Sequence, residues 1–228
     1  MSNFTPSSTA EMVFSNAETK ELLVDILKHN IDFPTNGRNT LLLYGTYGSG
    51  KTTYANIFFN EYEKSFGGDT ACVEFIDVDG NEKITTTIDR LSNMSSLMAI
   101  QHKSLKHYFL FDEVDGYNEK QQQRLKSWMN SENVVCVLTT NHIQRIDKGL
   151  RSRCFEVEFN ASTNAYDYVM RIKQIIQQHK LPMLNDDVLY DIAERGKGDW
   201  REICATLQRV CSKTKTLPPT KPKLTIVS

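Results

Sequence analysis

The sequence predicts an α/β fold, with a parallel five-stranded sheet and flanking helices, followed by a small all-α domain. Three observations support this prediction. Short apolar runs typical of strands alternate with helical stretches through the first 160 residues, the order produced when helices connect parallel strands. A glycine-rich loop directly follows the first of these runs. After Asn160 the strand-like runs stop and only helical patterns continue.

The elements of the first region can be taken in chain order. Leu22, Leu23, Ile26 and Leu27 recur at helical spacing, which predicts an N-terminal helix over residues 18–29. Five strands are predicted over residues 41–44, 72–78, 108–111, 134–139 and 155–159. Helices are predicted between them over residues 53–64, 85–101 and 119–129. We therefore expect an α/β domain over residues 1–160 with its ligand at the carboxyl edge of the sheet.

Residues 161–214 are predicted to form the helical domain. One apolar helical face runs from Val169 to Ile176, a second helix covers residues 188–195, and a third covers residues 199–211. Asp199 suits the N-cap of the third helix. No acidic residue follows Glu202, so residues 215–228 are predicted to be a flexible basic tail. That tail is either a solvated terminus or an arm that docks a partner electrostatically.

The composition indicates an ordinary soluble protein of one or two domains. The 228 residues carry a formal net charge of -1, with 39% apolar and 24% charged residues. No leader-like segment opens the sequence, and no run approaches the ~18 apolar residues of a membrane span. We expect an intracellular protein, cytoplasmic or nuclear in a eukaryote, that is not secreted and has no membrane partner. The five cysteines form no C-x-x-C pair, which argues against zinc and favours small core residues.

The glycine-rich loop is the strongest functional signal. It matches G-x-x-x-x-G-K-[ST] and is followed by Thr53; its residues are Gly45, Thr46, Tyr47, Gly48, Ser49, Gly50, Lys51 and Thr52. We call residues 45–52 the phosphate loop. A lone match could be a turn without chemical meaning, but here a strand precedes it and a helix follows. Lys51 supplies a cation for the phosphates of a nucleoside triphosphate, and the Thr52 hydroxyl can ligate Mg²⁺ at the helix N-terminus.

A second cluster of candidate residues follows two later strands. Asp112 and Glu113 end the strand of residues 108–111, so we expect them at the same sheet edge as the phosphate loop. Asp112 can support the Mg²⁺ shell, and Glu113 can orient or deprotonate an attacking water. An acidic pair alone is often a solubilising turn, but the phosphate loop upstream favours the catalytic interpretation. Asn141 is expected beside Glu113, as a γ-phosphate or water ligand or as a simple turn residue.

These motifs resemble those of AAA+ ATPases, and more narrowly those of sliding-clamp-loader small subunits such as replication factor C. The resemblance covers roughly residues 41–211. The segment from Asp112 to Met129 resembles the family's Walker B box and the DNA-facing helix behind it. Ser152-Arg153-Cys154 is the motif most specific to clamp loaders, and Gly198-Asp199-Trp200-Arg201 resembles the sensor 2 motif of the lid domain.

The resemblance implies an ATPase that uses ATP and Mg²⁺ in an oligomer of identical or different AAA+ subunits. Arg153 would reach the ATP of the neighbouring subunit, Arg201 would contact the γ-phosphate from the lid of its own subunit, and Arg151 is a weaker candidate for the first role. Lys120, Arg124 and Lys126 would contact DNA phosphates without regard to sequence. The alternatives are surface arginines and an ordinary solvated helix face.

Two features of the family's pattern are missing from the sequence. The helical collar domain that joins clamp-loader subunits is not included, and neither is the N-terminal Arg-Pro box near the adenine site. The sequence therefore predicts either a compact loader or a subunit whose partner supplies the missing contacts. The leading hypothesis is a replication ATPase that loads a sliding clamp, or another replication protein, on primer–template DNA. The alternatives are an AAA+ helicase loader or DNA-remodelling ATPase, and a scaffold subunit that binds ATP without hydrolysing it.

Overall fold

The computed structural model describes residues 4–35, 37–78, 84–131 and 133–215, which fall into two compact units. The first unit covers Thr5–Asn164, and the second combines Phe4 with the described residues from Ala165 onward. We expected residues 1–160 to form one domain, but Phe4 belongs to the second unit. Its ring packs edge-on against His179, with 5.1 Å between the ring centroids. The predicted basic tail lies outside the described residues beyond Lys215.

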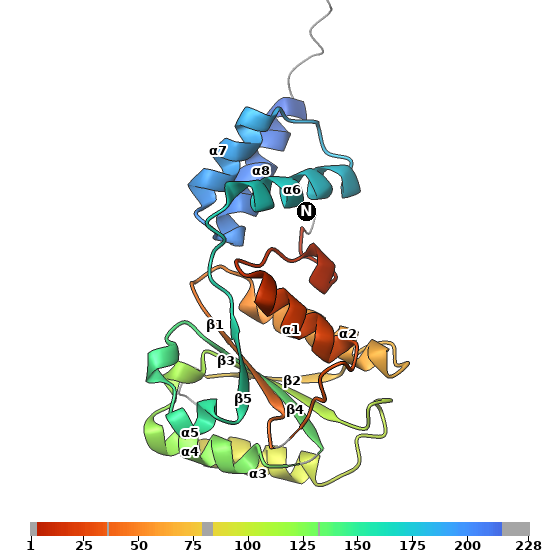
Figure 1. The fold of residues 1–228 in the computed structure, drawn as a ribbon, viewed down its shortest axis with the longest axis vertical. Coiled ribbons are helices and arrows are strands. Elements are labelled where there is room, and N and C mark those ends of the chain that lie inside the picture. Colours follow the sequence, from red (N-terminus) through yellow and green to blue (C-terminus); the bar gives the residue numbers. More distant parts are fainter. Residues whose placement is uncertain (1–3, 36, 79–83, 132, 216–228) are drawn as a thin grey trace, which may run out of the picture. The chain divides into compact units, whose positions relative to one another are not determined.

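The first unit is built on a parallel five-stranded sheet, as predicted. The strands are β1 (Thr40–Tyr44), β2 (Val73–Asp77), β3 (His107–Asp112), β4 (Val134–Thr140) and β5 (Cys154–Glu158). Their order across the sheet is β2-β3-β4-β1-β5, and every neighbouring pair is parallel (Figure 1). Tyr44 of β1 pairs with Thr140 of β4, and Phe111 of β3 pairs with Leu138. The carboxyl ends of these three strands therefore meet at one edge of the sheet.

Helices cover both faces of this sheet (Figure 1). Helices α1 (Ala17–Leu27) and α2 (Lys51–Ser65) lie on one face. The other face carries α3 (Ile84–Ser95), α4 (Glu119–Trp128) and α5 (Lys148–Arg151). Short 3-10 helices are formed by η1 (Thr9–Glu11), η2 (Val114–Gly116) and η3 (Ile143–Arg145). This three-layer arrangement buries both faces of the sheet, as parallel sheets require.

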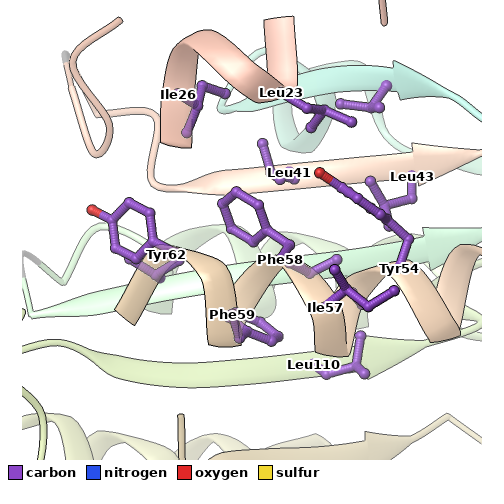
Figure 2. Packing of buried hydrophobic residues seen from close by; sticks show 14 of the residues in the cluster. Leu23, Ile26, Leu41, Leu43, Tyr54, Ile57, Phe58, Phe59, Tyr62 and Leu110 are labelled. Atoms are coloured by element: carbon purple, nitrogen blue, oxygen red, sulfur yellow. The ribbon is translucent and has the colours of Figure 1, made fainter. Parts of the chain in front are cut away.

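The alternation of side chains along each strand divides the core into two clusters. Leu41 and Leu43 of β1 point toward α1 and α2, where they meet the aromatic face of α2, including Tyr54 and Phe58 (Figure 2). Leu42, between them, belongs to the cluster under α3 and α4. Burying each of these large side chains contributes about 1.5–3 kcal/mol. Because side chains pack against both faces of these strands, the carboxyl edge of the sheet is held firmly in place.

Glu63 forms a buried polar junction between α2 and the segment that leads into β3. It is only 1% exposed, and its carboxylate accepts hydrogen bonds from the Tyr108 hydroxyl at 2.6 Å, the Ser104 hydroxyl at 2.8 Å and the Lys103 backbone N–H. Burial alone raises the pKa of the Glu63 carboxyl, but the hydrogen bonds from Tyr108, Ser104 and Lys103 outweigh it and lower that pKa from the ordinary value of a glutamate. The junction fixes the C-terminal half of α2 against the sheet.

The second unit is helical, as predicted. It contains α6 (Ala165–Gln178), α7 (Asp186–Gly196) and α8 (Trp200–Lys215), which bury one apolar face each. Asn185 caps α7 by accepting a hydrogen bond from the Val188 N–H at 3.1 Å. The side chain of Asp199 accepts one from the Arg201 N–H at 2.8 Å, which confirms the predicted N-cap of the third helix. No helix among the described residues is long and apolar enough to cross a membrane.

Two expectations about local structure need correction. The predicted helix over residues 85–101 ends at Ser95, and the following segment leaves Leu97, Met98 and Ile100 exposed. All five cysteines are free thiols; Cys136, Cys154 and Cys211 are buried as predicted, but Cys204 is only partly buried and Cys72 is exposed. Burial raises the pKa of the Cys154 thiol to about 12, so this thiol is inert at neutral pH.

Candidate nucleotide-binding site

The phosphate loop leaves β1 at the carboxyl edge of the sheet and enters α2. Gly45 has a φ of 150°, and a Cβ at this position would lie 2.3 Å from the Phe159 carbonyl oxygen, so only glycine fits. Gly50, at the N-cap of α2, adopts the left-handed region with a φ of 94°. The Ser49 hydroxyl closes the loop by donating to the Thr46 carbonyl at 2.8 Å. The N-terminus of α2 thus faces the loop, and the helix dipole favours an anion there.

The Lys51 side chain lies folded into the loop rather than extended into solvent. Its Nζ donates hydrogen bonds to the carbonyls of Gly45 at 3.1 Å and Thr46 at 2.7 Å, and to Oδ1 of Asn141 at 2.8 Å. Residue Lys51 is 8% exposed. The structure therefore joins the cation of the phosphate loop to the predicted Asn141 at the end of β4. These hydrogen bonds keep the ammonium of Lys51 inside the loop, where a phosphate would bind.

Thr52 and Asp112 come together at the same edge. The Thr52 hydroxyl donates to Oδ1 of Asp112 at 2.7 Å, across 60 residues of sequence. Among the described residues no hydrogen bond reaches Oδ2 of Asp112, which leaves a carboxylate oxygen beside a hydroxyl oxygen. Mg²⁺ prefers such hard oxygen donors and usually keeps several waters, so one carboxylate and one hydroxyl are a sufficient protein contribution. The donor set therefore fits the predicted Mg²⁺.

Glu113 does not continue the strand. Its backbone adopts the left-handed conformation with φ 59° and ψ 48°, which is uncommon for a residue with a side chain and costs about 1–3 kcal/mol. Its N–H donates to the side-chain hydroxyl of Thr139 at 3.0 Å instead of to a backbone carbonyl of the neighbouring strand β4. The Asn141 amide donates to Oε1 of Glu113 at 3.4 Å. The structure thus brings Glu113 and Asn141 together, with Asn141 bridging the carboxylate and Lys51.

The two candidate finger arginines have different surroundings. Arg151 pairs with Glu156 through two hydrogen bonds of 2.9 and 2.8 Å, and this pairing raises the pKa of its guanidinium. Arg153 lies beyond α5, and the described residues offer its guanidinium neither a hydrogen bond nor an ion pair. Arg153 is therefore the arginine that is available to a group outside its own chain.

Arg201 belongs to the second unit, where it lies exposed in the first turn of α8. Its backbone N–H is bound by Asp199, while the described residues give its guanidinium no hydrogen bond or ion pair. Its expected contact with the γ-phosphate stays a prediction.

Comparison with known protein families identifies the chain. Residues 41–162, more than half of the sequence, match the model described as ATPase family associated with various cellular activities (AAA). The chain belongs to the AAA ATPase family. Membership of this family implies nucleotide binding, which agrees with the phosphate loop and the Lys51 contacts. A comparison with curated proteins gave no match.

Solved structures with the same fold match over most of this chain, including both units. The Thermotoga maritima RuvB Holliday junction branch migration motor matches with a TM-score of 0.69 and 20% identity, over 93% of this chain and 66% of RuvB. The replication initiator DnaA bound to AMPPCP and single-stranded DNA matches with a TM-score of 0.64 and 18% identity, over 91% of this chain and 66% of the DnaA chain. C. elegans PCH-2 matches with a TM-score of 0.65 and 14% identity, over 92% of this chain and 65% of the PCH-2 chain. This chain spans just under two thirds of each of these proteins.

The three basic residues proposed to contact DNA do not share one surface of this AAA domain. Lys120 and Arg124 line an open groove of about 840 Å³ between α3 and α4, and Arg124 also hydrogen-bonds the Thr85 hydroxyl. Lys126 is only partly exposed and lies on another side of α4, close to Gly149 of α5. Two residues along a helix are separated by about 200°, which accounts for the difference.

Sequence reasoning missed several polar residues that support this AAA site. Thr139 binds the Asp112 carboxylate and the Glu113 N–H at the end of β4, and His142, which was also missed, contacts through Nε2 the hydroxyl of the predicted loop residue Tyr47 at 3.3 Å. Gln122, 2% exposed, binds the backbone of Tyr117, Arg145 and Asp147 and so links α4 to the segment that leads to Arg153. Gln122 lies in the segment that resembles the Walker B box and the helix behind it, but its link to the backbone before α5 was not predicted.

Proposed function

We propose that this protein is an Mg²⁺-dependent ATPase. The observation that carries the proposal is the connected set of side chains at the carboxyl edge of the sheet. Lys51 is bound to Asn141, Asn141 to Glu113, and Thr52 to Asp112, although these residues come from distant parts of the sequence. A cation, two carboxylates and an amide, gathered by these hydrogen bonds beside a helix N-terminus, provide each group that metal-assisted phosphoryl transfer to water uses.

Each residue has a role that follows from its surroundings. Lys51 can exchange its carbonyl partners for phosphate oxygens, because its ammonium already lies in the loop. Thr52 and Asp112 would hold Mg²⁺, which when bound neutralises charge on the phosphates. Glu113 can accept a proton from the attacking water, and the amide of Asn141 holds the carboxylate in place on the side of Lys51. Positioning and charge stabilisation then provide most of the rate.

Phosphate release from ATP tests this proposal directly. We expect release that needs Mg²⁺ and falls ~100-fold or more in Glu113→Gln, because the amide cannot accept the proton, while binding of a fluorescent ATP analogue is retained. The same purification of both proteins controls for contaminating ATPases. Equal release by Glu113→Gln and the wild type would remove Glu113 from the mechanism. Tight ATP binding without release under any condition, with partners present, would favour a scaffold subunit.

At a finer level, we propose a clamp-loader-like role in DNA replication. In this role ATP binding organises AAA+ subunits around primer–template DNA, and hydrolysis releases a ring-shaped clamp onto it. The Ser152-Arg153-Cys154 motif supports this proposal, together with an Arg153 guanidinium that has no partner among the described residues. An arginine donated to the ATP of an adjoining subunit would make hydrolysis depend on assembly.

A DNA-remodelling ATPase or helicase loader is the second candidate. It is favoured by the fold likeness to a Holliday junction branch migration motor and to an initiator bound to single-stranded DNA. The two candidates differ in what stimulates ATP hydrolysis. We expect primed DNA with a sliding clamp to raise the rate several-fold more than single-stranded DNA with a replicative helicase. The reverse order would reject clamp loading and support the second candidate.

A further inference from the structure

Two consecutive threonines at the end of β4 make the same pattern of hydrogen bonds to different groups. Thr139 and Thr140 are 1% and 0% exposed. The Thr139 hydroxyl donates to Oδ1 of Asp112 at 2.6 Å and accepts the N–H of Glu113 at 3.0 Å. The Thr140 hydroxyl donates to Oδ1 of Asp115 at 2.6 Å and accepts the N–H of His142 at 2.9 Å. Successive side chains of a strand point to opposite faces, so only Thr139 reaches the two acidic residues of the candidate site.

Thr139 determines where the carboxylate of Asp112 points. Oδ1 of Asp112 accepts two hydroxyl hydrogen bonds, from Thr139 and from Thr52. These two donors lie on different elements, β4 and α2, so together they restrict rotation of the carboxylate. The restriction keeps Oδ2, which has no hydrogen bond from the described residues, on the side away from both donors. With Thr52 as the single donor, the carboxylate could turn about that one bond.

The same hydroxyl also supports the backbone of Glu113. The left-handed conformation of Glu113 takes its N–H out of the strand ladder, and the Thr139 oxygen is the acceptor that replaces the ladder carbonyl. On the other side of the residue, the Glu113 carbonyl accepts the Gly116 N–H at 2.9 Å. The turn at Glu113 is therefore held from both ends. The turn directs the Glu113 side chain toward Asn141, and Oε1 of Glu113 lies 3.4 Å from the Asn141 amide nitrogen.

We infer that Thr139 is a positioning residue, which orients both carboxylates of the acidic pair through one buried hydroxyl. The inference rests on the proposed function for its effect on turnover, but its effect on the Asp112 carboxylate can be measured without turnover. Valine has nearly the same shape and lacks both the donor and the acceptor. Serine keeps the hydroxyl and loses only a methyl group.

The test compares Thr139→Val, Thr139→Ser and Thr140→Val in the full chain. Binding of a fluorescent ATP analogue is titrated with Mg²⁺, and phosphate release is measured at saturating nucleotide with the partners that stimulate it. For Thr139→Val we expect the Mg²⁺ concentration at half-saturation to rise, and kcat to fall, each by ~10–100-fold, as is usual when the support of a metal ligand is removed. Analogue binding in EDTA should stay unchanged.

Thr140→Val is the matched control, because it loses the same two kinds of hydrogen bond from the neighbouring buried threonine. Thermal unfolding of both valine variants should change by similar amounts, whereas Mg²⁺ dependence and kcat should change only in Thr139→Val. Thr139→Ser should return both quantities to within about 3-fold of the wild type, since the hydroxyl carries the effect. Wild-type Mg²⁺ dependence in Thr139→Val, equal losses in Thr140→Val, or failure of serine to rescue would each overturn the inference.

The two proposals can fail separately. If the wild type released no phosphate with any partner, the ATPase proposal would fall, and the Mg²⁺ titration would still decide the role of Thr139. If the wild type hydrolysed ATP and Thr139→Val did so with unchanged Mg²⁺ dependence and kcat, the ATPase proposal would stand and Thr139 would be a structural residue only.

Discussion

Arg151 and Arg153 are only two residues apart, yet their charges are used differently. The guanidinium of Arg151 forms an ion pair with Glu156 in the middle of the edge strand β5, with an N–O distance of 2.8 Å. Arg153 has no such partner among the described residues, so no competing carboxylate has to be displaced before it meets an anion. Arg151 therefore forms an ion pair within the chain, whereas the guanidinium of Arg153 can bind an anion of another molecule.

The pair gives a prediction with a built-in control. Arg153→Ala should lower turnover of the assembled protein ~10³-fold or more and leave ATP-analogue binding by the isolated chain unchanged. Arg151→Ala should cost less than about 1 kcal/mol of stability and change turnover little, because it removes a partly exposed ion pair. Phosphate release and unfolding by urea measure the two effects.

A mixing experiment tests whether Arg153 acts between subunits. A Glu113→Gln subunit cannot use its own site but still carries Arg153, so it should restore turnover to an Arg153→Ala subunit beside it. Recovery on mixing two inactive variants would establish action in trans. Two variants that stay inactive together, in an oligomer shown to be mixed by mass, would instead point to a role for Arg153 within its own chain.

At this scale the sequence predicted the residues with distinctive chemistry better than the residues that support them. Lys51, Thr52, Asp112 and Asn141 stand in recognisable patterns, and the structure brings them into contact. Thr139 could not be identified, because a threonine at the end of a strand has the same sequence signal as any β-branched strand residue. Its role depends on the pairing of β3 with β4, which only the fold supplies.

Among the elements, α2 carries two separate tasks along its length. Its first turn provides Lys51 and Thr52, and its last turns provide the buried Glu63 that binds the segment before β3. β3 in turn ends in Asp112. The two ends of α2 thus fix both the phosphate loop and the strand that carries the acidic residues. Loosening either end would allow the phosphate loop and β3 to move relative to each other.

Glu63→Gln should destabilise the protein by about 2 kcal/mol at pH 7, since a neutral amide weakens hydrogen bonds to a charge and turns a donor toward Tyr108 or Ser104. The hydrogen bonds to Glu63 lower its pKa in the folded protein from the ordinary value of a glutamate. Its ionised form therefore stabilises the fold fully above the unfolded-state pKa, and this contribution is lost as the pH falls through the folded value.

The stability difference between wild type and Glu63→Gln should accordingly narrow below about pH 4.5. Urea unfolding at pH 7 and pH 4 measures it, and the exposed Glu21→Gln on α1 serves as the control, with little change at either pH. A difference that stays constant from pH 7 to pH 4 would show that packing, and not the charge of Glu63, holds the junction.

Helix and strand positions were predicted well where an apolar pattern was long. They were predicted less well where a few polar contacts determine where an element ends. Helix α3 stops at Ser95, six residues before the predicted end. The segment that follows is tied down by His102, which accepts the N–H of Cys72 at 2.9 Å and contacts the Lys106 carbonyl at 2.7 Å. The left-handed turn at Glu113 has the same cause, because a hydroxyl from another strand supports it. Contacts of this kind between distant segments leave no local periodicity in the sequence.

For the whole molecule, the alternation of strands and helices was enough to predict the parallel sheet and the helical region after it. The order β2-β3-β4-β1-β5 was beyond the sequence alone, because parallel strands of similar composition can be arranged in several ways. That order puts β1 between β4 and β5, and so sets the phosphate loop beside Asn141.

Phe4 also has a practical consequence for the helical unit. Because this ring lies against His179, the unit is discontinuous in the chain and draws on both ends of the sequence. A fragment that starts at Ala165 would leave bare the side of His179 that Phe4 covers, and a truncation of the first few residues would remove a packing partner from the C-terminal helices. Dissection of the protein into separately expressed pieces should therefore keep Phe4 joined to the helical unit, for example through a linked or permuted chain.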